Sequence, residues 1–130
     1  MFITCDQILC HFIGDFFLQS DWVGLNKYNK FIVALAHACW YTLPFIFLTI
    51  NPWALLTICL THAIIDHYKL AAYISWAKNW LSPVRPKPWK SCCFTGNDPE
   101  RPLWISVWLN IIVDNVTHII INGAAIYYFG

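Results

Sequence analysis

Histidine and aspartate side chains recur one helical turn apart in a chain that is otherwise strongly apolar. Residues four apart lie on the same face of an α-helix, so each pair presents an imidazole nitrogen and a carboxylate oxygen together. These are ligand atoms for zinc, and also for manganese, iron or nickel. The candidate metal ligands are the pairs His11 and Asp15, His62 and Asp66, and Asp114 and His118, together with the lone His37.

Seven donors are too many for one tetrahedral ion and about right for two. The expected cofactor is one or two divalent transition-metal ions, with zinc the first choice. Three Asp carboxylates and one bridging hydroxide would balance the charge of two such ions, which a medium of low dielectric constant requires. The alternative interpretation is a polar core joined only by hydrogen bonds and salt bridges.

The composition is that of a membrane protein. Of the 130 residues, 58% are hydrophobic and only 12% are charged, whereas charged residues make up about 25% of soluble domains. A bilayer-spanning helix needs about 20 mostly apolar residues, and four stretches come close to or exceed that length. They are residues 2–19, 31–50, 53–76 and 103–129. The predicted fold is therefore all-α, a single domain over residues 1–130 that forms an integral membrane four-helix bundle with a polar His/Asp core.

The basic residues predict the orientation of this bundle. Lys27 and Lys30 lie in the first connection, and four more lie in the predicted loop 81–102, namely Arg85, Lys87, Lys90 and Arg101. By the positive-inside rule these two connections face the cytoplasm and both termini lie outside it. Ionisable groups at membrane depth are costly, so the His and Asp side chains are expected to face one another inside the bundle.

The same motifs resemble a known family. HFIGDFFLQSDW followed by Lys27, a lone histidine in the second helix, HAIIDHYK and DNVTH are similar to the small bacterial and phage membrane proteins of the DUF3307 family. That family shows an HxxxDFxxQ start, an HxxxDxxK centre and a DQxxH end; Asn115 stands here where Gln is usual. The resemblance implies a multi-pass protein of the bacterial inner membrane and supplies no activity.

The first functional hypothesis is a metal-dependent hydrolase whose intramembrane site opens to the cytoplasmic side. Metal ions would acidify a bound water and polarise a phosphoryl or acyl oxygen. Asp66, His67 or Asp114 would accept a proton, and Lys69 would stabilise developing negative charge. The substrate would be a membrane lipid or a phosphate-containing group attracted by the basic loop.

Two other functions stay open, and the sequence does not decide whether the protein is an enzyme at all. Chains of Asp and His across a membrane also make proton or ion relays. A non-catalytic bacterial or phage protein could instead bind a host membrane protein or another copy of itself through its aromatic outer faces. The net charge of +1 gives no reason to expect a specific nucleic acid.

Overall fold

The computed structural model of the chain describes all 130 residues and contains helices but no strands. It divides into two compact units. The first unit comprises Met1–Tyr68 and His118–Gly130, and the second comprises Lys69–Thr117. The predicted all-α class is therefore confirmed, and the two units are described separately below.

The first predicted helix, over residues 2–19, is shorter and consists of two parts. Helix α1 (Cys5–Phe12) starts at a capping box in which Thr4 and Gln7 exchange backbone and side-chain hydrogen bonds. It continues as a π-helical turn, η1 (Ile13–Phe17). Gly14 lies in this turn against the backbone of Tyr41, a close approach that a side chain would prevent.

The first connection, residues 20–30, contains a short helix, α2 (Asp21–Asn26), whose N-cap is Ser20. The next helix, α3 (Phe31–Thr42), tightens into the 3₁₀ turn η2 (Leu43–Phe47). Pro44 explains the change, because it has no N–H to donate and its ring clashes with the carbonyl four residues earlier. Helix α4 (Pro52–His67) then begins at Pro52, capped by Asn51.

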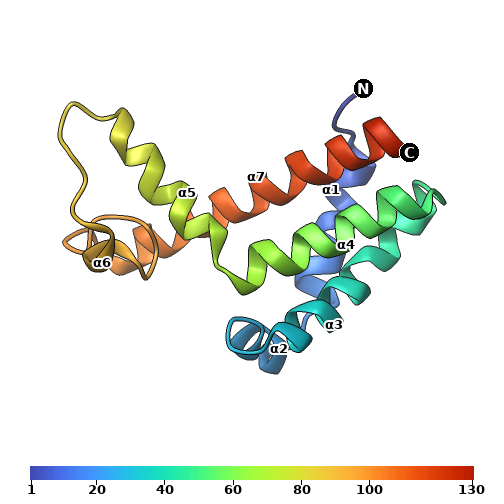
Figure 1. Cartoon of the computed structure of the whole chain (residues 1–130), viewed down its shortest axis with the longest axis horizontal. Coiled ribbons are helices and arrows are strands. Elements are labelled where there is room, and N and C mark those ends of the chain that lie inside the picture. The colour runs from blue at the N-terminus through green and yellow to red at the C-terminus, as the bar shows by residue number, and fades with distance from the viewer. The chain divides into compact units, whose positions relative to one another are not determined.

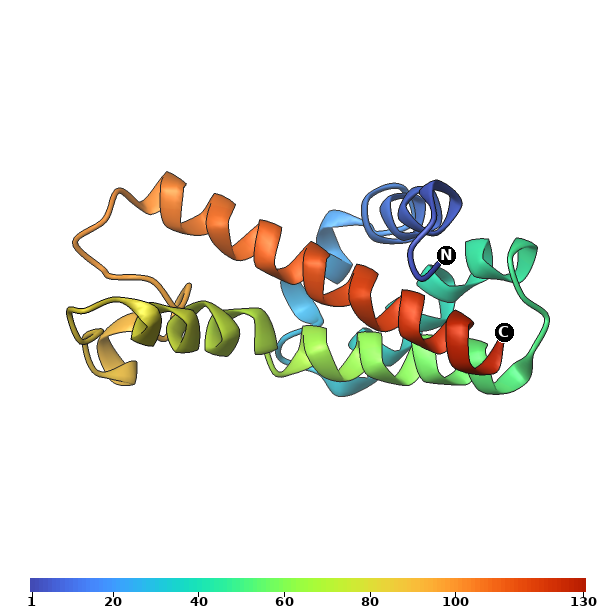
Figure 2. The same cartoon turned by 90° about the horizontal axis from the view of Figure 1, so that it is seen from above.

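Helices α3 and α4 lie side by side in the first unit, and α1 crosses them (Figure 1). Figure 2 shows α1 nearly end-on while α4 runs across the view. The apolar core of the unit contains Tyr41 from α3, Phe45 from η2 and Ile58 from α4, joined by Cys10 from α1 and Ala125.

The third predicted helix, residues 53–76, is broken. Helix α4 ends at His67, and Lys69 adopts a left-handed conformation with φ of 52° before α5 (Leu70–Lys78) begins. A left-handed residue just beyond the last turn is a common way for a helix to end. The apolar pattern continues across the break, so the sequence periodicity did not predict it.

The second unit folds the predicted loop 81–102 onto α5. The chain passes through η3 (Asn79–Leu81) and the short helix α6 (Trp89–Cys92) before α7 (Leu103–Phe129). Gly96 has φ of 78° and lies so close to α5 that a Cβ would fall 1.9 Å from the carbonyl oxygen of Ala72. Lys87 pairs with Asp98 at 3.0 Å and with Glu100 at 2.9 Å. The loop is therefore ordered against the helix.

One helix, Leu103–Phe129, is long and apolar enough to cross a membrane, judged by length and composition. Its bounds match the predicted fourth helix. The apolar helix Phe31–Phe47 is shorter than a full span, and the other two predicted spans are divided into shorter elements. Four complete membrane spans are thus not confirmed.

Candidate metal centre

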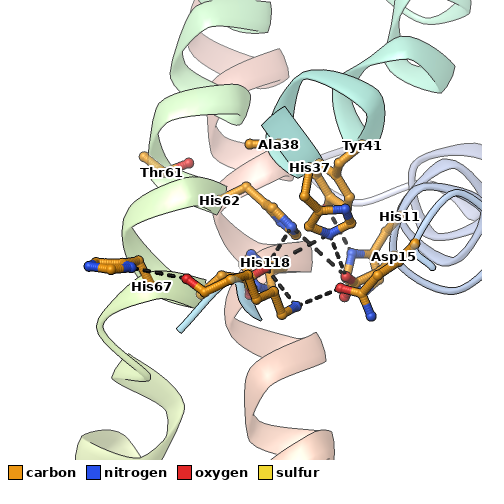
Figure 3. Close-up of polar contacts among 12 residues, drawn as sticks. His11, Asp15, His37, Ala38, Tyr41, Thr61, His62, His67 and His118 are labelled. Carbon is orange, nitrogen blue, oxygen red and sulfur yellow. Dashed lines mark hydrogen bonds and ion pairs between the residues drawn. The ribbon is translucent and has the colours of Figure 1, made fainter. Parts of the chain in front are cut away.

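Four buried side chains meet inside the first unit. Asp15 comes from η1, His37 from α3, and His62 and Asp66 from consecutive turns of α4. One ligand atom from each lies within 4.8 Å of all the others. Figure 3 shows Asp15, His37 and His62 converging from different elements. The expected inward-facing His/Asp cluster is present and could hold a metal ion.

The separations of these donor atoms suit the ligand shell of a single ion. His37 Nε2 is 3.3 Å from Asp15 Oδ1 and 3.8 Å from Asp66 Oδ2. His62 Nε2 is 3.1 Å from Asp66 Oδ2 and 3.8 Å from Asp15 Oδ1. A tetrahedral zinc site with bonds near 2.1 Å requires ligand atoms about 3.4 Å apart. The four distances lie on either side of that value, so an ion would need only small adjustments.

The imidazoles of the cluster are incompletely satisfied. Nδ1 of His37 and both ring nitrogens of His62 are buried without a hydrogen-bond partner. His62 Nε2 is close to Asp66 Oδ2 but outside hydrogen-bonding geometry. A buried polar atom left unpaired costs about 1–3 kcal/mol. A metal ion would give the Nε2 atom of His62 the partner that the protein does not supply.

Lys27 is a member of the cluster that the sequence interpretation missed. Its ammonium nitrogen is 2.8 Å from Asp66 Oδ2 and 2.8 Å from Gln19 Oε1, and the residue is only 5% exposed. Burial alone would lower the pKa of Lys27, but the nearby carboxylates of Asp66 and Asp15 raise it above its usual value. The lysine therefore stays charged, although the sequence had placed it in a solvated basic connection.

Tyr41 forms a second layer behind the four donors. Its ring stacks on that of His62, with the centroids 3.6 Å apart and the planes 17° from parallel. Its hydroxyl lies 2.7 Å from His11 Nδ1 and accepts a hydrogen bond from the side-chain amide of Asn122. Because Asn122 donates, the hydroxyl can donate its own proton to His11. His11 thus supports Tyr41 and is not one of the four converging donors.

A family model described as "Protein of unknown function (DUF3307)" matches residues 3–128. The chain belongs to this family. No curated protein and no solved structure matches it. The resemblance noted for the sequence is therefore confirmed over nearly the whole chain. In this DUF3307 protein the HxxxD motifs of the first and third predicted helices supply Asp15, His62 and Asp66 to the cluster.

His118 approaches the cluster of this DUF3307 protein from the end of α7 that belongs to the first unit. Its Nε2 atom lies 3.4 Å from Asp66 Oδ1, and its ring centroid is 4.2 Å from that of His62. Lys27, His37 and His62 all lie nearest to Oδ2 of Asp66, whereas His118 lies nearest to Oδ1. His118 can therefore orient this carboxylate or add a fifth donor.

The remaining sequence candidates, His67, Lys69 and Asp114, are not among the four converging donors of this DUF3307 protein. His67 points away from the cluster in Figure 3, and its Nδ1 atom is 3.0 Å from the backbone oxygen of Lys27. Lys69 is the left-handed residue at the end of α4 and belongs to the second unit. Asp114, which is half-buried, also belongs to the second unit, one turn before His118 on α7.

Proposed function

We propose that this protein is an integral membrane metalloprotein that uses a divalent metal ion for hydrolysis. The ion would be held by Asp15, His37, His62 and Asp66. The observation that carries the proposal is a set of four buried donor atoms that lie within 4.8 Å of one another. Their His–Asp distances are 3.1–3.8 Å, and the set includes an imidazole nitrogen without a hydrogen bond. Zinc is the first choice, and manganese, iron and nickel accept the same ligands.

Membrane placement rests on the outer surface of the first unit. Large apolar side chains are exposed on most of its helical elements, with Phe17 85% and Phe47 92% exposed. Exposed apolar side chains in this number favour contact with a membrane or a partner. A four-helix bundle in the bacterial inner membrane, with both termini outside the cytoplasm, would cover this surface with lipid while its polar groups face inward.

A bound divalent ion would supply a Lewis acid and a water whose pKa is lowered toward neutrality. Asp66 is held by Lys27 through Oδ2 and faces His118 through Oδ1, so its orientation is determined from two sides. Lys27, rather than Lys69, is the lysine whose ammonium lies among the donors, and it would attract an anionic group. A lipid or another phosphate-containing substrate fits that charge.

Metal content is the decisive measurement. The protein should be purified in detergent without chelator, and its metals quantified by mass spectrometry. We expect about one equivalent of a transition metal in the wild type and none in His62→Ala. His67→Ala is the matched control, because this neighbouring histidine contacts the Lys27 backbone instead of the cluster, and it should keep the metal. Folded wild-type protein without metal would refute the proposal.

A proton or ion relay is the second candidate. Buried protonatable groups follow one another from Lys27 through Asp66 to His118, at 2.8 Å and 3.4 Å, and a continuous polar chain at membrane depth is typical of relays. Proton flux into liposomes containing the purified protein tests it. A relay requires flux that Asp66→Asn abolishes, whereas a hydrolase requires no flux in either protein.

A further inference from the structure

The ammonium of Lys27 contacts the same carboxylate oxygen that the metal would use. Asp66 Oδ2 is 2.8 Å from Lys27 Nζ, 3.1 Å from His62 Nε2 and 3.8 Å from His37 Nε2. The lysine is therefore a third partner of this ligand atom, beside the two imidazoles. A metal ion and this ammonium would share one oxygen and lie close to each other.

The charges of the cluster explain why an ammonium lies beside Asp66. Asp15 and Asp66 are both buried, and the imidazoles around them carry charge only when protonated. A buried carboxylate needs a cation or several donors to offset the loss of water. Lys27 is the lysine that meets this need in the first unit, because its Nζ atom is buried against Asp66.

The backbone of Lys27 is held while its side chain has a second acceptor within reach. The Lys27 N–H donates to the carbonyl of Val23, and the Lys27 carbonyl oxygen is 3.0 Å from His67 Nδ1. At the other end of the side chain, the ammonium contacts Gln19 Oε1 as well as Asp66. Gln19 is not one of the four donors, so the ammonium can keep this contact when Asp66 takes another partner.

We propose that Lys27 is the resident counter-cation of the metal-free centre, and that its ammonium withdraws from Asp66 toward Gln19 when a divalent ion binds. The second half of this inference rests on the proposed metal-dependent function. Like charges repel strongly where the dielectric constant is low, so Lys27 should weaken metal binding. The same residue should stabilise the protein while no metal is present, which makes metal loading an exchange of one cation for another.

Lys27→Met tests the inference, because methionine keeps much of the apolar stem and removes the charge. Lys30→Met is the matched control, since Lys30 is exposed and lies three residues away. Zinc affinity would be measured by competition with a chromophoric chelator, and thermal unfolding would be followed with and without zinc. We expect Lys27→Met to unfold at a lower temperature than the wild type without zinc, to bind zinc at least tenfold more tightly, and to regain the wild-type midpoint at saturating zinc. Lys30→Met should match the wild type in every measurement.

Equal or weaker zinc binding by folded Lys27→Met would overturn the inference. If the single variant does not fold without metal, the double variant Lys27→Met/Asp66→Asn keeps the counter-cation testable, because the lysine is dispensable once the carboxylate is gone. In that case the double variant should fold, and its failure to fold would overturn the counter-cation role. Where both single variants fold, a double-mutant cycle in metal-free protein should show strong coupling between the two residues, and additive effects would overturn the same role. If all folded variants bind no zinc, the proposed function fails, and the cycle still decides the metal-free half of the inference.

Discussion

Replacement of Gly14 by alanine should separate η1 from α3 and disturb the metal centre. A Cβ at this position would lie 2.6 Å from Cδ2 of Tyr41 and 2.8 Å from its carbonyl oxygen. Ordinary contacts begin near 3.4 Å, so the two elements must move apart by about 0.8 Å. The second obstacle is a backbone atom, which no rotamer change can remove. Asp15 follows Gly14 directly and would move with it.

The loss of stability can be estimated from this geometry. Overpacking a close helix contact costs about 1–3 kcal/mol, and it exceeds the gain of about 1 kcal/mol that alanine brings to a helix over glycine. We therefore expect Gly14→Ala to lower the free energy of unfolding by up to about 2 kcal/mol. Metal–ligand distances in well-formed sites lie within about 0.2 Å of their usual values, so a shift of Asp15 would distort the site. Metal affinity should accordingly fall by about 10- to 100-fold, as it does when groups that orient ligands are lost.

Gly24→Ala is the control, because a Cβ there would meet only the flexible end of the Gln19 side chain, at 3.4 Å. It should leave the protein as stable as the wild type or more stable. Both variants would be compared by thermal unfolding in detergent and by chelator competition with zinc. If Gly14→Ala unfolds and binds zinc as Gly24→Ala does, the close packing of η1 on α3 does not position Asp15.

Three further predictions concern the second unit. Lys69→Gly should raise stability by about 1 kcal/mol over Lys69→Ala, because glycine adopts the left-handed conformation at φ of 52° without strain; equal thermal midpoints would contradict this. Gly96→Ala should release the loop 81–102 from α5, because its Cβ would overlap the Ala72 carbonyl. The release would be seen as faster proteolysis within residues 81–102, and unchanged cleavage would show that the loop tolerates the side chain. Finally, the backbone N–H of Glu100 and the ammonium of Lys87 lower the pKa of Asp98. Its stabilising effect is present above the usual Asp pKa of about 3.9 and is lost as the pH falls through the lowered value. Acidification should therefore alter the fluorescence of Trp76, whose indole donates to the Lys87 carbonyl. If fluorescence changes with pH in the same way in the wild type and in Asp98→Asn, the prediction is wrong.

The sequence predicted those features of the fold that depend on local pattern. The apolar run and its flanks predicted the bounds of α7, because a long helix needs only continuous apolar periodicity. The spacing of His62 and Asp66 predicted that both side chains leave α4 on one face. The π turn of η1 and the break at Lys69 were not predicted, since neither interrupts the apolar pattern.

The candidate site was predicted in part for a related reason. The types of its ligands and their inward direction follow from the cost of burying charged groups among apolar ones. Which ligands meet depends on how helices pack. Packing turned His11 toward Tyr41 and His67 toward the Lys27 backbone, although both have the same side chain as the donors His37 and His62.

The sequence by itself thus determined an all-helical chain whose His and Asp residues must be buried together, because helical periodicity and desolvation act on neighbouring residues. Only the tertiary structure decided that Asp15, His37, His62 and Asp66 converge and that Lys27 joins them from a connection between helices. Lys27 and Asp66 are 39 residues apart in the chain. This contact forms only when the close approach at Gly14 and the packing of α3 on α4 bring the two segments together. No local pattern in the sequence predicts it.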